Sequence, residues 1–488
     1  IQFDLDQGLK CKFKYADDQK SLSGFIQSGI LMYHMTLQKS GNKFTGIWKP
    51  FMVESLEPSS IYLSVEKSED SRLVLYPFFG DQRFTGTWCM DFQREGDIIR
   101  FRDFKTGLNF KAQLLDTSIQ LDALLGDVLI NRSSLSRSEK DWEFGSLGLV
   151  QQSASVKDGW KISNAQEAGL DQNILSQMEK SIRDGTFTNT HSVLIAKEGK
   201  IAYETYFDGY QADIPHDQRS ASKSFASAMI GIGLEDGLIE SVEQKLYDFI
   251  PQEYQSSKDA QKSKIRIQDL LTMSSGFEVS RNSGASEGNY QNTDNWLKSV
   301  LEASMKDAPG THANYSSASP FLLGICLDER LDQPMELYMD EKLLAPLGIH
   351  NYIIQSDETR SRPYFGGGMY LTSRDMLKFG QLYLNKGQWQ GKQILSEDWV
   401  QASHKKHFAL ENVIDKNDYG YQWWHHSYQV GDKTYASIEA RGNGGQYIFV
   451  LPELASVVVI TSGNYNNGKL IQQPEQILEE YILPAIVN

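Results

Sequence analysis

RSASKSFASAMIGIGLEDGL, residues 219–238, is the stretch on which the interpretation of this chain depends. It carries apolar and small residues on nearly all sides of a helix, so the helix is expected to be buried, and Gly237 is placed to end it. Ser220 and Lys223 are three residues apart and therefore lie about one turn apart on the same face. Burial favours the neutral amine of Lys223, which can take or relay the proton of the Ser220 hydroxyl.

The Ser-x-x-Lys spacing by itself has little specificity. It recurs at three other places in the chain: Ser40 and Lys43, Ser64 and Lys67, and Ser403 and Lys406. These pairs are predicted in a hairpin turn, at a strand end and in a polar segment, so none of them opens a buried helix. The helical context therefore selects Ser220 as the candidate nucleophile.

Other segments of the chain match one family in its own order. They are GKIAYE (199–204), IQDLLTMSSG (267–276), PGT followed by NYSS (309–317), GGMYLTSRD (367–375), YGYQWW (419–424) and GNGGQ (442–446). With residues 219–238 they resemble the β-lactamase-related serine hydrolases over most of residues 155–488. This family includes class C β-lactamases, D-Ala-D-Ala peptidases, family VIII carboxylesterases and nylon-oligomer hydrolases. The resemblance implies an acyl-enzyme on Ser220 and a central antiparallel sheet with an inserted helical lobe.

The resemblance also implies roles for residues far from Ser220 in the sequence. Tyr315 is the expected second proton-transfer residue, and a neighbouring cation is expected to lower its pKa towards a partial phenolate. Residues 442–446 are expected to form a strand beside Ser220, where Gly444 and Gly445 let substrate approach the backbone. The oxyanion hole is then expected from the Ser220 N–H and one further N–H, for which Asn443 and Gln446 remain alternatives.

Two departures from the family pattern bear on the substrate. Ser317 stands in the Asn place of the family's Tyr-x-Asn, and it can hydrogen-bond with a shorter reach. The family's Lys-Thr-Gly or His-Thr-Gly becomes Asn443-Gly444-Gly445, which lacks the cation that helps hold a substrate carboxylate. Arg441 compensates only if its side chain turns inward. We therefore expect cleavage of an ester or amide, with a β-lactamase or D-amino-acid peptidase as the alternative.

The N-terminal part of the chain differs in character. Short strand-like segments separated by turn signals predict an antiparallel sandwich or barrel over residues 1–130. The segment Phe44–Trp48 returns as Phe84–Trp88, and its Gly-x-Trp pattern is faintly similar to lipocalin-like barrels. Polar composition predicts a linker at 131–154, followed by the hydrolase domain at 155–488. The expected fold class is therefore α+β in two domains.

Composition narrows the partners. The 488 residues carry a formal net charge of -15, which argues against nucleic-acid binding. The sequence contains no run of eighteen apolar residues, so no membrane-spanning helix is expected. We expect a small-molecule or short-peptide substrate, no metal and no organic cofactor. An exported protein with its leader removed is expected. Cys11 and Cys89 fit a disulfide in an exported protein, and three free thiols with Cys326 fit equally well.

Two rival interpretations remain. Gly284-Ala285-Ser286-Glu287-Gly288 matches the Gly-x-Ser-x-Gly elbow of α/β-hydrolases, but its flanks are polar where the elbow needs a buried strand and a helix. A loop bordering the active-site cleft is the preferred interpretation of this segment. The second rival is a binding protein on a disabled hydrolase scaffold, against which the intact Ser220, Lys223 and Tyr315 argue.

Overall fold

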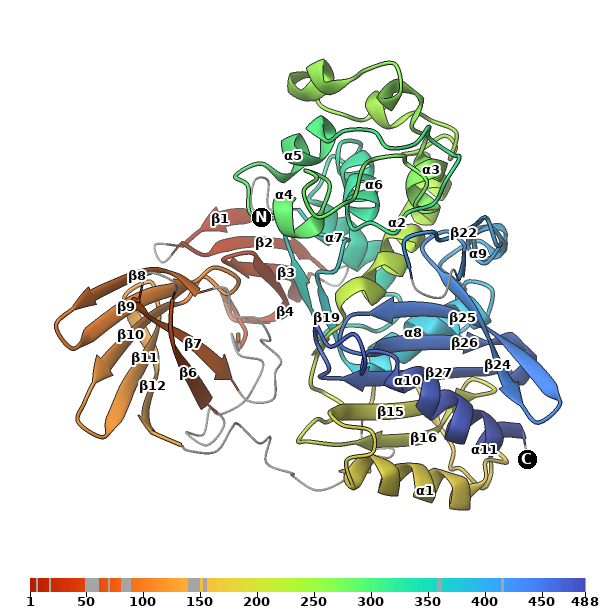
Figure 1. Ribbon diagram of the computed structural model, residues 1–488, viewed down its shortest axis with the longest axis horizontal. Helices are drawn as coiled ribbons and strands as arrows, with labels where there is room; N and C mark the ends of the chain where they lie inside the picture. The colour runs from red at the N-terminus through yellow and green to blue at the C-terminus, as the bar shows by residue number, and fades with distance from the viewer. Residues whose placement is uncertain are drawn as a thin grey trace.

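The computed structural model describes residues 1–5, 8–16, 19–48, 61–68, 71–79, 89–138, 150–151, 156–357, 362–413 and 417–487. In Figure 1 the first strands of the chain lie at the left, a lobe of short helices at the top, and a large sheet with flanking helices at the lower right. The described chain is thus an α+β protein with antiparallel N-terminal sheets, as expected from the sequence.

The large sheet brings together strands from the two ends of the hydrolase region. Ten strands of the described chain form it in the order β13-β16-β15-β27-β26-β25-β24-β23-β22, with β14 beside β16. The hairpin β15–β16 pairs with β27 near the C-terminus, so strands far apart in the sequence share one sheet. The strands are β13 (Val150–Gln151), β14 (Lys161–Ile162), β15 (Thr190–Lys197), β16 (Lys200–Tyr206), β22 (Phe408–Ala409), β23 (Asp418–Tyr419), β24 (Trp424–Val430), β25 (Lys433–Gly442), β26 (Gln446–Leu451) and β27 (Ser456–Ser462).

Helices cover both faces of this sheet because β15, β26 and β27 are apolar on both sides. One face packs against α8 (Ser373–Leu384) and the other against α1 (Gln172–Arg183), α10 (Gln473–Ile477) and α11 (Leu483–Val487). The segment between β17 (His216–Asp217) and β18 (Ile353–Gln355) forms the helical lobe. Its helices are α2 (Lys223–Glu235), α3 (Ile267–Leu271), α4 (Glu287–Tyr290), α5 (Trp296–Glu302), α6 (Ala318–Asp328) and α7 (Met335–Met339).

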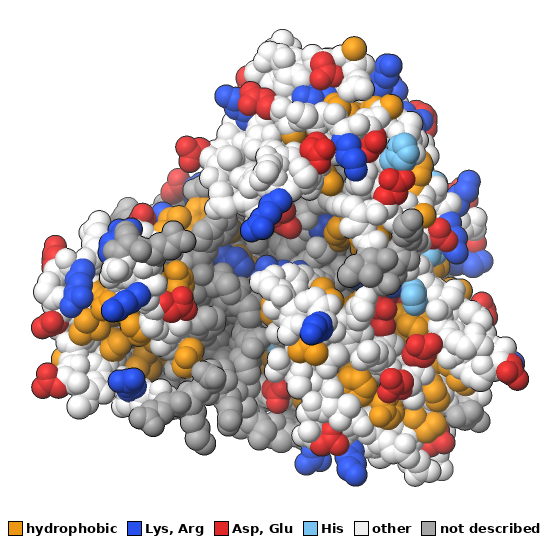
Figure 2. Space-filling model, in the orientation of Figure 1, with side chains coloured by type: hydrophobic (Ala, Val, Ile, Leu, Met, Phe, Trp, Pro, Cys, Tyr) orange, Lys and Arg blue, Asp and Glu red, His pale blue; other side chains and the backbone are white. Residues whose placement is uncertain are grey.

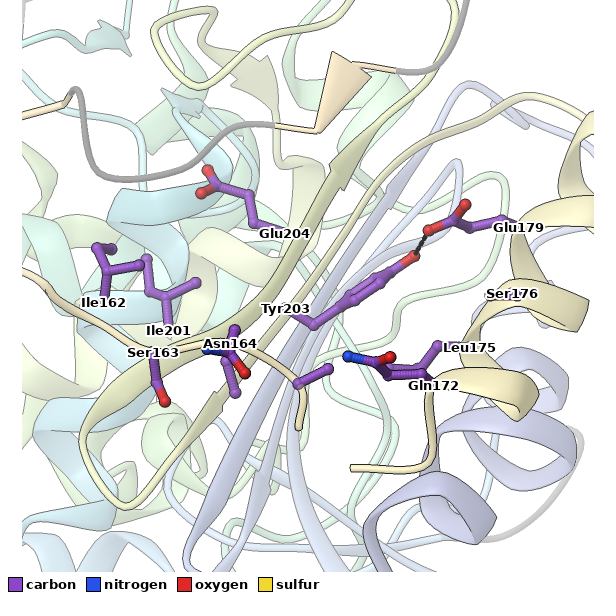
Figure 3. Close-up of a pocket in the computed structure, with 12 residues that line it drawn as sticks. Ile162, Ser163, Asn164, Gln172, Leu175, Ser176, Glu179, Ile201, Tyr203 and Glu204 are labelled. Carbon is purple, nitrogen blue, oxygen red and sulfur yellow. Dashed lines mark hydrogen bonds between the residues drawn. The ribbon is translucent and has the colours of Figure 1, made fainter. Parts of the chain in front are cut away.

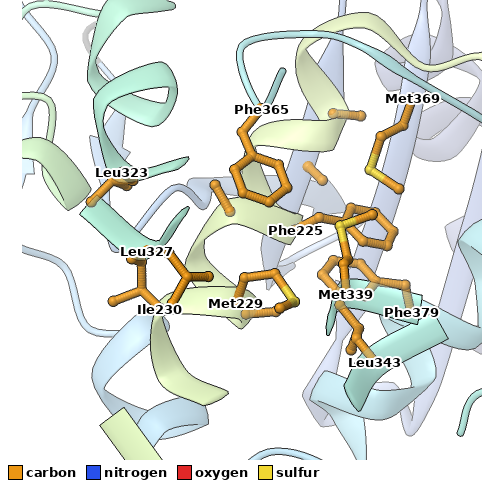
Figure 4. Close-up of a cluster of buried hydrophobic side chains, with 14 of the residues drawn as sticks. Phe225, Met229, Ile230, Leu323, Leu327, Met339, Leu343, Phe365, Met369 and Phe379 are labelled. Atoms are coloured by element: carbon orange, nitrogen blue, oxygen red, sulfur yellow. The ribbon is translucent and has the colours of Figure 1, made fainter. Parts of the chain in front are cut away.

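Helix α2 lies in the centre of the largest apolar core. Residues 223–233 are all buried, and Phe225 stacks on Phe379 of α8 with 3.7 Å between ring centroids. Figure 4 shows Phe225, Met229 and Ile230 of α2 among apolar side chains of the lobe and of α8. The helix ends at Glu235, and Gly237 follows in the left-handed region at φ +74°, which confirms its predicted role as terminator.

The N-terminal strands continue into a sheet that contains strands from the hydrolase region. The order is β1-β2-β3-β4-β18-β19-β17, with β5 beside β4. Leu31 and Tyr33 of β4 share an apolar core with Ile353 of β18, so the contact between the N-terminal strands and β18 is tightly packed. The strands are β1 (Gln2–Asp4), β2 (Lys10–Tyr15), β3 (Ser21–Ser28), β4 (Leu31–Ser40), β5 (Lys43–Thr45), β17 (His216–Asp217), β18 (Ile353–Gln355) and β19 (Met369–Leu371).

Further N-terminal strands form a second antiparallel sheet in the order β12-β11-β10-β9-β8 and a separate β6–β7 hairpin. The last strand runs to Ser136, into the stretch predicted as linker, because its backbone pairs with β11 up to Ser118, and Arg132 also pairs with Asp122 of β11 at 2.6 Å. The domain limits themselves stay a prediction. The strands are β6 (Ile61–Lys67), β7 (Leu73–Phe79), β8 (Cys89–Glu95), β9 (Ile98–Asp103), β10 (Asn109–Leu114), β11 (Ser118–Leu125) and β12 (Val128–Ser136).

Several expectations from the sequence concern single features of the described chain. The first Gly-x-Trp copy follows β5, whereas the second, Phe84–Trp88, lies outside the described residues. Cys11, Cys89 and Cys326 are free thiols. No helix of the described chain is long and apolar enough to cross a membrane. Over the same residues, no group of three or more His, Cys, Asp or Glu side chains has the arrangement of a metal site.

Candidate active site

The candidate nucleophile sits on a tight turn that leads into α2. Residues Arg219–Ser222 form a single 3₁₀ turn, and Arg219 adopts φ +49°, a left-handed conformation unusual for a side chain of this size. Asp217 holds this conformation by accepting the Arg219 backbone N–H at 3.1 Å and pairing with its guanidinium at 2.9 Å. Ser220 is half-buried there, so its hydroxyl reaches both the helix interior and the cavity in front of it.

Lys223 is buried directly behind Ser220. Its side-chain nitrogen lies 2.8 Å from Ser220 Oγ and 3.0 Å from Ser317 Oγ, and it also donates to the backbone carbonyl of Gly366. Burial lowers the pKa of Lys223 to about 8, although the charge of Glu287 acts in the opposite direction. The neutral amine needed to accept a proton from Ser220 is therefore accessible near neutral pH, as the sequence predicted.

Tyr315 converges on the same point from the loop before α6. Its hydroxyl is hydrogen-bonded to the Ser220 side chain, and Lys223 Nζ lies 5.2 Å from the centroid of its ring. The prediction that Tyr315 is partly a phenolate is wrong, however, because burial raises the pKa of its hydroxyl. A phenol that stays protonated is suited to donate a proton or a hydrogen bond.

Asn412 holds the Tyr315 loop in place. The Tyr315 backbone N–H donates to Asn412 Oδ1 at 2.6 Å, and Asn412 Nδ2 donates to the Tyr315 carbonyl at 3.0 Å. The residue before Asn412 adds a third hydrogen bond between the same two segments, since the Glu411 N–H donates to the Ala313 carbonyl at 2.9 Å. Residues almost a hundred positions apart are thereby fixed to one another, and no motif in the sequence indicates this pairing.

The segment 442–446 differs from the predicted continuous strand. Gly442 ends β25, residues 443–445 turn with φ +95° at Gly444 and +90° at Gly445, and Gln446 begins β26. The positive φ angles explain why two glycines stand here, and they also break the strand. Gly442 is needed for a different reason: a Cβ at this position would lie 2.1 Å from the Gln218 carbonyl oxygen beside the nucleophile turn.

The side chains of the two candidates for the second oxyanion donor lie in different places. Asn443 lines the same cavity as Ser220 and Gly442. Gln446 is fully buried, and its side-chain amide bonds Ser462 of β27 on the far side of the hairpin. Gly442 and Asn443 thus line the cavity together with Ser220, whereas Gly444 and Gln446 do not, and the choice of backbone donor between Asn443 and Gln446 stays a prediction.

A cavity of about 560 Å³ opens in front of Ser220 and Tyr315. Arg441 lines it, but its guanidinium pairs with Glu439 at 2.6 Å and with Glu475 at 3.2 Å. The same guanidinium stacks between the rings of Trp424 and Tyr447, at 5.1 and 5.6 Å from their centroids. The inward orientation of Arg441 is thus realised, and its charge is balanced by two carboxylates.

Trp424 lines the cavity, whereas other large aromatic residues of this region belong to the core. Trp296 and Trp423 are completely buried, and Tyr421 is 5% exposed and packed in the main core. The rival nucleophile Ser286 precedes α4 and follows a loop instead of a buried strand, so it lacks the architecture of an elbow. Its neighbour Glu287 reaches the active site, which agrees with the interpretation of this segment as a border of the cleft.

A second cavity, of about 500 Å³, lies between α1 and β16. Figure 3 shows Tyr203 directed at Glu179, to which its hydroxyl donates at 2.7 Å, while Glu204 points to the other side of β16. None of the predicted site residues lines it. On the face of the molecule shown in Figure 2, Lys and Arg side chains are interspersed with Asp and Glu.

The comparisons with known proteins agree with this geometry. The Beta-lactamase family profile matches residues 175–481, and the chain belongs to this family. It is 22% identical to the 6-aminohexanoate-dimer hydrolase of Paenarthrobacter ureafaciens over 293 residues, covering 56% of this chain and 72% of that protein.

Two solved structures show the same fold. One is a penicillin-binding protein homolog from Caulobacter crescentus, with a TM-score of 0.53 and 12% identity, covering 67% of this chain and 99% of that one. The other is EstCE1, a hydrolase with promiscuous acyltransferase activity, with a TM-score of 0.50 and 16% identity, covering 65% of this chain and 99% of that one. The chain therefore has the β-lactamase fold, and its relatives include hydrolases.

Proposed function

We propose that this protein is a serine hydrolase that cleaves an ester or amide bond through an acyl-enzyme on Ser220. The observation that carries the proposal is the contact of Ser220 Oγ with Lys223 Nζ at 2.8 Å and with the Tyr315 hydroxyl in one half-buried site. A serine hydroxyl is a weak nucleophile until an adjacent base takes its proton. A buried lysine with a pKa of about 8 supplies that base.

The two steps follow from the protonation states. Neutral Lys223 accepts the Ser220 proton as Oγ bonds to the substrate carbonyl carbon, and the oxyanion is received by the backbone N–H of Ser220 and by that of Asn443 or Gln446. Tyr315, which stays protonated, donates to the departing alcohol or amine and is reprotonated through Lys223. Water then attacks the acyl-enzyme by the same proton path in reverse, and Ser220 is restored.

The cavity supports an uncharged substrate. Arg441, the cation nearest to the family's substrate-carboxylate position, is already paired with Glu439 and Glu475. Moving it to a substrate carboxylate would leave the buried charge of Glu439 with only the Tyr428 hydroxyl as a partner, which is costly. The remaining polar lining is formed largely by amides, namely Asn412, Asn417, Asn443, Asn466, Asn467 and Gln472. This observation disfavours the alternative of a β-lactamase or D-amino-acid peptidase, whose substrates carry a carboxylate.

A hydrolysis panel tests the proposal. It contains short nitrophenyl esters, a chromogenic cephalosporin and D-amino-acid amides, and it compares wild type with Ser220→Ala and with the matched serine control Ser286→Ala. We expect turnover of the neutral esters, its loss in Ser220→Ala and its retention in Ser286→Ala. Turnover that survives in Ser220→Ala would refute the proposal.

Labelling with a fluorophosphonate separates this proposal from a non-catalytic binding protein. The reagent modifies only an activated serine, so mass spectrometry should find the adduct on the peptide that contains Ser220. Complete absence of labelling together with absence of turnover would favour the binding protein.

A further inference from the structure

Glu287 lies behind the catalytic lysine, although it belongs to no family motif in this sequence. It is the first residue of the short helix α4 in the lobe. One carboxylate oxygen accepts the Ser317 hydroxyl at 3.0 Å, and the other accepts the Tyr364 hydroxyl at 2.5 Å. Tyr364 in turn lies 2.5 Å from the Tyr290 hydroxyl. Glu287 is therefore held from both sides in a defined orientation.

The chemistry of these groups determines the direction of each hydrogen bond. An ionised carboxylate only accepts, so the single hydroxyl proton of Ser317 must point to Glu287. The Ser317 oxygen is then left as an acceptor for the N–H of Lys223, 3.0 Å away. The backbone carbonyl of Gly366 likewise only accepts from Lys223.

These two acceptors account for both protons of a neutral lysine amine. The remaining lone pair of Lys223 then points to its third neighbour, Ser220 Oγ at 2.8 Å. This is the orientation in which an amine removes a proton from a hydroxyl. After the transfer, the ammonium has three N–H groups for the same three oxygens, so no buried polar group loses its partner.

We propose that Glu287 is a positioning residue that acts through Ser317 to direct the lone pair of Lys223 at Ser220. The proposal rests on the proposed function, since it concerns the base of that reaction. It also explains the departure at Ser317. A hydroxyl rotates and can donate or accept, so Ser317 alone would be free to donate to the Lys223 lone pair and block it. The carboxylate removes that freedom.

The charge of Glu287 has a second consequence for Lys223. Among the described residues, Glu287 is the charged group whose field acts on the Lys223 ammonium. Burial lowers the pKa of Lys223 to about 8, and the negative charge of Glu287 opposes that shift. The ring of Tyr315 and the oxygens of Ser220, Ser317 and Gly366 complete the surroundings. Removing the charge should therefore lower the pKa of Lys223 further.

The test is the pH profile of kcat/KM for a neutral nitrophenyl ester in wild type, Glu287→Gln and Glu287→Asp. Exposed Glu302→Gln on α5 is the matched control, because it removes a carboxylate of the lobe away from the site. Glutamine offers one carbonyl oxygen where two hydroxyls need an acceptor. We expect Glu287→Gln to lower the plateau at least about tenfold and to move the acid limb about one pH unit down. Glu287→Asp keeps the charge, so its limb should stay while its plateau falls.

The outcomes are distinguishable from failure of the proposed function. If Ser220→Ala abolishes turnover but Glu287→Gln keeps the wild-type limb and plateau, this inference alone is overturned. A lower melting temperature with an unmoved limb in Glu287→Gln indicates a purely structural role and also overturns it. If Glu287→Gln does not fold, an acid limb shifted downward in Glu287→Asp contradicts the argument, whereas an unmoved limb with a reduced plateau supports it. Turnover that survives in Ser220→Ala removes the proposed function and this inference with it.

Discussion

The pKa of Lys223 gives a quantitative prediction for the rate. With a pKa of about 8, roughly 9% of the lysine is neutral at pH 7, half at pH 8 and roughly 91% at pH 9. If the neutral amine is the base, kcat/KM should rise about tenfold between pH 7 and pH 9 and then level off. A lysine at the ordinary value of 10.5 would be only about 3% neutral at pH 9, so its rate would still be climbing there.

The sign follows from the cause of the shift. Burial disfavours the ammonium, which lowers the pKa and brings the limb down into the accessible pH range. Tyr315 contributes no second limb in this range because its pKa is raised and it stays protonated. The profile should therefore rise once and reach a plateau.

The assay is the hydrolysis of a neutral nitrophenyl ester from pH 6 to pH 10, with spontaneous hydrolysis subtracted at each point. Fluorophosphonate labelling of Ser220 over the same range provides a second measurement without a leaving-group step. Lys223→Arg is the control, because a guanidinium stays protonated throughout and should abolish both reactions. A limb below about pH 6.5, or a rate still rising at pH 10, would show that Lys223 is not the base or is not desolvated as the structure indicates.

Three further predictions follow from contacts outside the Ser-x-x-Lys motif. Asn412→Ala removes both hydrogen bonds to the Tyr315 backbone, so kcat should fall about tenfold while KM and the melting temperature stay nearly unchanged. A kcat equal to that of wild type in steady-state kinetics would show that these two hydrogen bonds do not position Tyr315. Gly442→Ala places a Cβ 2.1 Å from the Gln218 carbonyl oxygen, so labelling of Ser220 by the fluorophosphonate should slow at least about tenfold. An unaltered labelling rate would show that the turn at residues 219–222 accommodates the methyl group without displacing Ser220. Glu204→Ala leaves Arg374 buried without the partner that it bonds at 2.5 and 2.6 Å, so urea denaturation should show a loss of about 3–5 kcal/mol in the free energy of unfolding; a loss below about 1 kcal/mol would mean that Asp158 suffices.

Much of the fold can be predicted from local patterns, for an identifiable reason. The hairpin of β15 and β16, the apolar strands β26 and β27 and the buried helix α2 are each specified by residues that are neighbours in the sequence. The end of β12, residues 131–136, is predicted as a linker from the sequence because its composition is mostly polar. Its strand conformation depends on backbone pairing with β11, which the composition does not show.

The pair of Ser220 and Lys223 follows from the sequence alone, because one turn of helix places residues three apart on the same face wherever the helix lies. The states and partners of the site depend on folding. Burial lowers the pKa of Lys223, as its apolar helix predicts, but burial of Tyr315 raises the pKa of the phenol, and no local pattern predicts that rise. Glu287, Gly366 and Asn412 lie 64, 143 and 189 positions after Lys223 in the sequence, so no local pattern marks them. Hydrogen bonds between distant loops form only when the packed core brings those loops together, and for that reason the tertiary structure alone shows how the base is aimed.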